Sequence, residues 1–275
     1  MKKASNFLLP IAIVAIVAVL FKEVFGPGTM NPLVVGSIVV VTMLGTSLLR
    51  PKNKSGKATV DSTFSLLGDF GKEAFSYDEA LSKLFQSAVT DFLNSMPKAA
   101  TKKLEKLQTL CKTDADTYAV SVALGMIKCY DDDHAAAISL FNRAVVLHPS
   151  AQLADALASA HQRIGELEKA IDSYEFALDL DPDAIDIRAK LATAHVGNGE
   201  FETAIDQAQQ VLDRKEDHAS ALATIAICHG VLGRSDLSSG YTAQAVDAGY
   251  SQEKITSTIT ALKKKYKKTL EAMNG

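Results

Sequence analysis

Three histidines recur at a fixed spacing and are the residues most suggestive of chemistry. His161, His195 and His229 lie 34 residues apart, and imidazole is the commonest metal ligand in proteins. A shared ion would need bonds of about 2 Å to every ligand. Equivalent positions of stacked helices lie roughly 10 Å apart. We therefore expect structural histidines packed between helices, with no metal and no other cofactor.

A second candidate is the acidic turn Asp131–His134. Its carboxylates could hold a cation weakly, but an aspartate before a helix that starts near His134 is more typical of a helix cap. The chain contains no nucleophile elbow, Walker A loop, HExxH motif or dinucleotide-binding fingerprint. Its three cysteines form no CxxC pair and favour a reduced compartment. We therefore predict that this protein is not an enzyme.

The positions around the histidines repeat with the same period. Gly165, Gly199 and Gly233 are also 34 residues apart, and glycine commonly ends a helix in the left-handed conformation. Such a period indicates a stack of small supersecondary units. The apolar and small residues that share it are Leu157, Leu191 and Ile225, then Ala158, Ala192 and Ala226, then Ala170 and Ala204. In the preceding unit, 33 residues earlier, Leu124, Gly125, Ala137, Phe141, Ala144 and Pro149 correspond to Leu157, Ala158, Ala170, Tyr174, Ala177 and Pro182.

This pattern resembles the tetratricopeptide repeat. The family's Leu-Gly/Ala pair, its turn glycine, its Ala-x3-Phe/Tyr-x2-Ala motif and its terminal proline are all present over nearly half of the chain. The resemblance implies an all-α fold, an α-solenoid of about four repeats at 118–150, 151–184, 185–218 and 219–250. Repeat three has Glu216 in place of the final proline, and repeat four has Ser238 and Thr242 in its second helix. We interpret these departures as a decaying register within the same fold.

Helical segments flank the repeats (118–250) on both sides. Residues 62–117 are predicted to form a degenerate helical pair, interrupted at Met96-Pro97. Residues 251–275 are predicted to form a C-terminal capping helix with a solvated lysine face. Its apolar positions are Ile255, Ile259, Leu262 and Tyr266. Because no repeat can bury its apolar face alone, stacked neighbours should share a continuous core.

The N-terminal region contains two apolar segments, at about 7–25 and 33–49. Each is close to the length of a membrane-spanning helix, so residues 1–50 are predicted to form a transmembrane helical hairpin, followed by a basic linker at 51–61. Lysine and arginine flank both outer ends, which places these ends and the repeats on the cytoplasmic side. A bacterial inner membrane suits this arrangement, and an organelle membrane is the alternative. A cleaved signal peptide, or one span with an interfacial or protein-buried second helix, is the alternative.

Charge is unevenly distributed along the chain. Residues 1–57 carry seven Lys or Arg against Glu23, whereas residues 58–250 carry 16 Lys or Arg against 29 Asp or Glu. A lysine cluster at 263–268 contains Tyr266 as its only aromatic residue. We therefore expect a solvated helix face there and no nucleic-acid partner. An anionic membrane surface is the alternative partner for this cluster.

The family resemblance implies that the first helix of each pair lines a concave groove. This groove would be apolar at both ends and polar in the middle, which suits an amphipathic helix or an extended peptide. Val122 and Met126 stand where chaperone-binding relatives begin a Lys/Asn clamp, so this chain does not resemble them. The predicted partner-binding residues are Val122, Met126, Tyr130, Asp155, Ser159, Gln162, Arg163, Thr193, Val196, Ile227 and Val231.

These observations lead to one main functional hypothesis and two alternatives. The main hypothesis is a non-enzymatic, membrane-anchored scaffold or adaptor that recruits a protein partner to a membrane complex through the groove. The first alternative is a structural subunit of an oligomeric membrane machine, of the secretion or motility type, that self-associates as a homo-oligomer through residues 7–49. The second alternative is an exported envelope protein, which would require cleavage or inverted topology.

Overall fold

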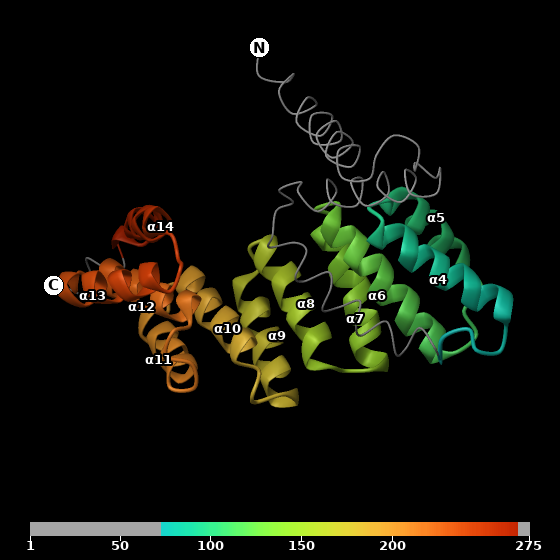
Figure 1. The fold of residues 1–275 in the computed structure, drawn as a ribbon, viewed down its shortest axis with the longest axis horizontal. Coiled ribbons are helices and arrows are strands. Elements are labelled where there is room, and N and C mark those ends of the chain that lie inside the picture. Colours follow the sequence, from blue (N-terminus) through green and yellow to red (C-terminus); the bar gives the residue numbers. More distant parts are fainter. Residues whose placement is uncertain (1–72, 269–275) are drawn as a thin grey trace, which may run out of the picture. The chain divides into compact units, whose positions relative to one another are not determined.

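The computed structural model describes residues 73–268, which form eleven α-helices (Figure 1). The predicted hairpin at 1–50 and the linker at 51–61 lie outside the described residues. Among the described helices, none has both the length and the apolar character that a membrane span needs. The helices are α4 (Glu79–Leu93), α5 (Pro97–Gln108), α6 (Asp114–Tyr130), α7 (His134–Leu147), α8 (Ala151–Arg163), α9 (Leu167–Leu180), α10 (Ile185–Asn198), α11 (Phe201–Leu212), α12 (Ala219–Val231), α13 (Ser235–Asp247) and α14 (Gln252–Lys265).

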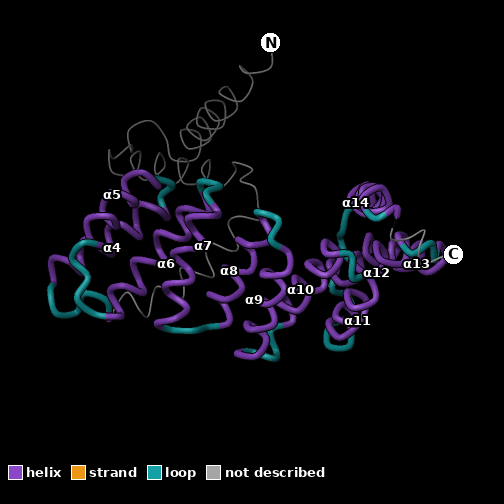
Figure 2. Tube along the Cα trace, turned by 180° about the vertical axis from the view of Figure 1, so that it is seen from behind, coloured by secondary structure: helices purple, strands orange, loops and turns teal. Residues whose placement is uncertain are grey.

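The helices pack in sequential pairs. The four repeats are α6–α7, α8–α9, α10–α11 and α12–α13, and α4–α5 forms a further pair before them. The second helix of each of the first four pairs also packs on the first helix of the next pair, so these five pairs form a continuous stack (Figure 2). The predicted all-α solenoid is confirmed. One difference from the expected boundaries is that α6 begins at Asp114, within the segment assigned to the degenerate pair.

Small residues allow the two helices of a pair to approach closely. Ala137, Ala170 and Ala204 occupy the same repeat position and are completely buried. Gly125 of α6 faces the Phe141 ring of α7, and a Cβ atom at Gly125 would lie 2.5 Å from the Cε1 atom of that ring. A glycine is therefore needed there for the ring to pack against the α6 backbone.

A residue in the left-handed conformation ends the first helix of each repeat. In repeats two to four it is glycine, and in repeat one it is Asp132, with φ of 60°. This explains the acidic turn that precedes α7, because Asp133 then caps that helix by accepting a hydrogen bond from Ala136 N at 3.3 Å. The interpretation of this turn as a helix cap is confirmed.

Asp116 fastens the segment before α4 to α6. Its buried carboxylate accepts hydrogen bonds from the backbone N–H of Phe75 at 2.7 Å, of Lys112 at 2.9 Å and of Thr113 at 3.0 Å. The Tyr77 hydroxyl donates a fourth at 2.9 Å. Burial by itself raises the pKa of this carboxyl, but the four donors outweigh it and hold the pKa below its ordinary value.

Candidate functional site

The histidines of repeats two and three each pair with a glutamate at the start of the following helix. His161 Nδ1 lies 2.7 Å from Glu166 Oε2, and His195 Nδ1 lies 2.5 Å from Glu200 Oε2. Both rings are buried. The contact joins the end of the first helix to the N-cap of the second, so each histidine has a structural partner within its own repeat, as expected.

The histidine of repeat four has a different environment. Arg234 stands where repeats two and three have glutamate, and it pairs with Glu202 of the preceding repeat. His229 Nδ1 is buried and has no hydrogen-bond partner. Burial, together with the positive charge of Arg234, lowers the pKa of His229. The repeated histidine position therefore meets a negative charge in two repeats and a positive charge in the last.

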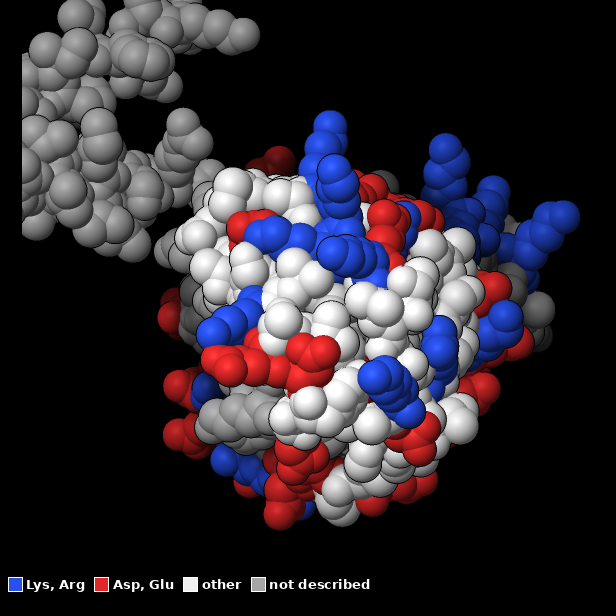
Figure 3. Space-filling model, turned by 90° about the vertical axis from the view of Figure 1, so that its right-hand side faces the viewer, with Lys and Arg blue, Asp and Glu red and all other residues white. Residues whose placement is uncertain are grey.

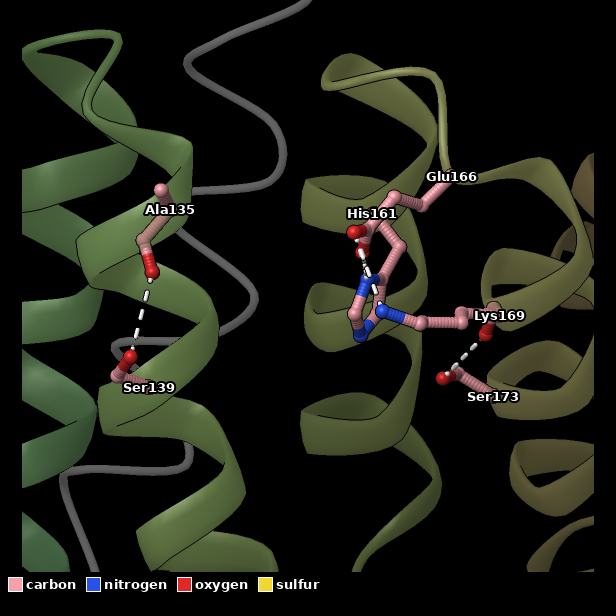
Figure 4. Close-up of polar contacts among 6 residues, drawn as sticks. All are labelled: Ala135, Ser139, His161, Glu166, Lys169 and Ser173. Carbon is pink, nitrogen blue, oxygen red and sulfur yellow. Dashed lines mark hydrogen bonds and ion pairs between the residues drawn. The ribbon is translucent and has the colours of Figure 1, made fainter.

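A pocket of about 530 Å³ lies between α7 and α9 and is floored by α8 (Figure 4). Its apolar lining comes from Ile138, Leu157 and Ile164, beside the buried His161 ring. Its polar rim contains Asn142, Glu166, Lys169, Asp172 and Ser173. The apolar floor and the polar groups around it form an open surface depression.

The polar side chains of the rim are fixed by local contacts. The Lys169 ammonium donates to Glu166 Oε1 at 3.1 Å, and the Ser173 hydroxyl donates to the Lys169 carbonyl at 2.8 Å (Figure 4). Hydrogen bonds from Lys169 and His161 hold the pKa of the Glu166 carboxyl below its ordinary value. The rim therefore presents an ionised carboxylate and an ammonium group beside the apolar floor.

The predicted α8 site residues lie on the opposite side of that helix from the pocket. With 3.6 residues per turn, positions 155, 159, 162 and 163 share one face, and positions 157, 161 and 164 share the other. On the predicted face, Lys190 Nζ lies 2.7 Å from both Asp155 carboxylate oxygens. The buried Tyr174 hydroxyl lies 3.2 Å from Ser159 Oγ and donates to Gln162 Oε1 at 3.0 Å. The two surfaces of α8 are thus separate candidate sites.

The apolar members of the predicted groove belong to the core, which corrects the prediction of apolar groove ends. Each is less than one-tenth exposed. The five residues are Val122, Met126, Val196, Ile227 and Val231. Val122 and Met126 pack in the N-terminal core cluster, whereas the other three share a cluster with side chains of α14. They are therefore not available to a partner in this structure.

The remaining predicted groove residues are accessible. Tyr130 is 58% exposed, with its ring 5.7 Å from that of Phe92 in an edge-on contact. Arg163 and Thr193 are exposed, and Asp155, Ser159 and Gln162 are half-buried. Figure 3 views the α4–α5 end, where basic and acidic side chains are interspersed among uncharged residues. The accessible groove surface of α8 and α10 is therefore polar.

Sequence reasoning missed the pocket because it assigned binding to a single face of the first helices. One signal in the sequence, the spacing of histidine and glutamate, could have found the polar rim. His161, Glu166 and Lys169 combine a buried ring with two charged side chains around a turn, and Glu166 follows its histidine by the same five residues as Glu200 follows His195. That spacing indicates an ordered polar rim, although only the structure shows that α7 leaves room beside it.

Comparisons with known proteins agree with this geometry. One tetratricopeptide repeat family model matches residues 122–185, and a second matches residues 165–228. Residues 122–228 are tetratricopeptide repeats. No curated protein sequence matches the chain.

Several solved structures share the fold. A crystal structure of MamA is 22% identical, with a TM-score of 0.54, and the match covers 58% of this chain and 93% of that one. A second MamA structure is also 22% identical, with a TM-score of 0.56 and coverages of 62% and 92%. YrrB, described as a TPR protein with an unusual peptide-binding site, is 14% identical, with a TM-score of 0.55 and coverages of 65% and 92%. At these identities the similarity establishes the fold alone.

Proposed function

We propose that this protein is a non-enzymatic scaffold that binds an extended segment of a protein partner through its tetratricopeptide repeats. The observation that carries the proposal is the pocket between α7 and α9, with its apolar floor and charged rim. The similarity of fold to YrrB, which is described as having a peptide-binding site, adds support.

The lining of the pocket suggests the chemistry of the bound segment. An aliphatic side chain would bury apolar surface against Leu157, Ile138 and Ile164, at about 25 cal/mol for each Å² removed from water. Backbone amides of an extended peptide would then lie near the rim, where Asn142 and the Glu166 carboxylate can accept hydrogen bonds and Lys169 can donate them. The polar face of α8 and α10, including Gln162, Arg163 and Thr193, offers a second set of contacts.

Attachment to a membrane is the second part of the proposal. Residues 7–49 would anchor the chain in a bacterial inner membrane, with the repeats on the cytoplasmic side. Tethering raises the effective concentration of a partner in the same membrane, so a weak pocket would suffice. The alternative, a structural subunit of an oligomeric membrane machine, would use the same segment for self-association.

Site-specific photo-crosslinking in native membranes tests the proposal. A photoreactive amino acid at Asn142, on the pocket rim, should yield an adduct with one other protein. The matched control places the same residue at Glu175, an exposed position of α9 that does not line the pocket. Adducts from Glu175 alone would contradict the pocket assignment. Adducts only with other copies of this chain would favour the membrane-machine alternative.

A further inference from the structure

Helix α14 has the sequence position of a fifth first helix. The first helices α8, α10 and α12 begin at Ala151, Ile185 and Ala219, and α14 begins 33 residues later at Gln252. Its 14 residues also match their length. A helix in this register should pack on α13, as α8 packs on α7 and α10 packs on α9.

The structure shows a different placement. Helix α14 packs mainly on α12 and only marginally on α13, and it lies beside α12 in both views (Figures 1 and 2). Ile255 and Leu262 of α14 share a buried cluster with Ile227 and Val231 of α12. Gly230 permits this approach, since a Cβ atom there would lie 2.5 Å from Ile259 Cδ1. An apolar helix surface thus covers part of the predicted groove.

The C-terminal end of α14 is hydrogen-bonded to repeat three. The Tyr266 hydroxyl donates to the Gly197 carbonyl at 2.5 Å, and Lys265 Nζ donates to the same oxygen at 2.9 Å. The Tyr266 ring meets the Phe201 ring edge-on, 5.5 Å between centroids. Lys265 is thus an exception to the predicted solvated lysine face. Helix α14 therefore bridges two repeats, as a ligand lying across the first helices would.

This placement leaves part of α13 uncovered. Val246 of α13 is 39% exposed, whereas Leu178, at the same position of repeat two, is 8% exposed and packs with residues of α10. The face of α13 that the repeat pattern assigns to the next helix is therefore available to α14, and the turn at Gly249, with φ of 93°, separates the two helices.

We propose that the α12 surface beneath α14 is a binding site for an amphipathic helix of a partner protein, and that α14 occupies it in the free protein. The contact residues of α14 indicate which residues a partner helix needs. A partner helix would carry aliphatic residues at positions i, i+4 and i+7, as Ile255, Ile259 and Leu262 do, followed by a hydrogen-bond donor at i+11 for the Gly197 carbonyl. On displacement, α14 would pack its apolar stripe on α13. This site is separate from the α7–α9 pocket and does not depend on it.

A synthetic peptide with the sequence of residues 250–268 serves as the probe. Its binding to the full-length protein in detergent is measured by fluorescence anisotropy, with a scrambled peptide of the same charge as control. A Gly230→Cys/Ile259→Cys pair should lock α14 in place when oxidised, because the glycine Cβ position lies within disulfide reach of residue 259. We expect at least tenfold weaker binding to the oxidised variant than to the same variant after reduction.

Two further variants weaken the contacts that Tyr266 makes with Gly197 and Phe201. Tyr266→Phe removes only the hydroxyl donor, and Tyr266→Ala removes the ring contact as well, so probe affinity should rise in that order, severalfold overall. Far-ultraviolet circular dichroism checks that each variant stays folded. Equal affinity for the oxidised and reduced forms of the locked variant would overturn the proposal. So would failure of the probe to bind any folded variant, which would identify α14 as a fixed cap.

Discussion

His161 and His229 occupy the same position of the 34-residue pattern, yet they belong to regions with different surfaces. In repeat two, the histidine pairs with Glu166, and the space beside it is an open pocket. In repeat four, Arg234 replaces that glutamate and the His229 ring lies 5.9 Å from the Tyr241 ring, while α14 covers the opposite face of α12 at Ile227 and Val231. The repeat pattern determines where a side chain lies on a helix. The adjacent elements determine whether a given helix face is left open, as beside His161, or is buried, as beneath α14.

The largest expected difference between the two regions is at the large side chain of the second helix. Tyr174 of repeat two is fully buried, whereas its equivalent, Thr242 of repeat four, is half-buried. Tyr174→Ala should cost about 3–5 kcal/mol of unfolding free energy, as for other buried aromatic residues. Thr242→Ala should cost less than about 1 kcal/mol, because it removes only a hydrogen bond to the Ser238 carbonyl within the same helix.

Urea unfolding followed by circular dichroism measures both changes. Tyr174→Phe is the control, because it keeps the ring and loses only the hydroxyl contacts with Ser159 and Gln162. Similar costs for Tyr174→Ala and Thr242→Ala would show that repeats two and four contribute equally to the core.

A second pair of variants tests the contact of α14 with repeat three. Gly165 and Gly199 both have a left-handed backbone, with φ of 82° and 87°. A Cβ atom at Gly165 meets nothing within 4 Å, whereas at Gly199 it would lie 2.7 Å from the Tyr266 ring. Gly165→Ala should cost about 1–2 kcal/mol from backbone strain alone. Gly199→Ala should cost about 1–3 kcal/mol more, because the ring must move.

Removal of the ring should abolish that excess. Combined with Tyr266→Ala, the Gly199→Ala substitution should cost no more than Gly165→Ala does, again by urea unfolding. An excess that persists without the ring would mean that α14 is not its cause.

Acidification should distinguish the two histidine environments. Because the pKa of His229 is lower in the folded chain than its ordinary value of 6.5, the unfolded chain binds more protons as the pH falls below about 6.5. This group's contribution to stability is therefore fully present above pH 6.5 and is lost as the pH falls through the folded pKa. Arg234→Gln removes one of the two causes of the shift, so the loss between pH 7.5 and pH 5.5 should be smaller in this variant.

The matched control is Arg214→Gln, which breaks the exposed ion pair between Arg214 and Asp183 in the preceding repeat. Unfolding midpoints at the two pH values, with a nuclear magnetic resonance titration of the His229 ring, provide the measurement. An unchanged pH dependence in Arg234→Gln, or an equal change in Arg214→Gln, would rule out the local effect.

The smallest stability effect is expected at the rim of the pocket. Lys169 is exposed and forms a surface ion pair with Glu166, and such pairs contribute about 0–1 kcal/mol. Lys169→Met should thus leave the unfolding midpoint nearly unchanged while reducing the yield of partner adducts from Asn142. The control is Lys190→Met, which alters the opposite face of the first helices. Reduced adducts with Lys190→Met alone would shift the site to that face.

Periodicity predicted the helix pairs well because the constraints behind it are local. The glycines at 165, 199 and 233 and the alanines at helix contacts act within one repeat, so spacing alone reveals them. The assignment of Asp131–His134 to a cap was also a local inference, whereas Asp132 in the place of a turn glycine was not predicted.

The surfaces were harder to predict because they depend on contacts between repeats. Ile227 and Val231 were assigned to an open groove, since no spacing indicates that α14 packs on α12 instead of α13. That choice depends on how Gly230 fits Ile259 and how Tyr266 reaches Gly197. The α7–α9 pocket was missed for a similar reason, since its floor and rim come from three helices.

The hydrogen bonds of Asp116 have a mechanical consequence. If the chain is anchored through its N-terminal segment as proposed, tension reaches the described fold near Phe75. The Phe75 N–H is bonded to Asp116 of α6, 41 residues further along the chain. Force on the N-terminal segment would therefore pass from Phe75 to α6 through this hydrogen bond. Helices α4 and α5, which lie between the two residues in the sequence, would bear little of it. The repeats could then bear tension from the membrane without unravelling from their first helix.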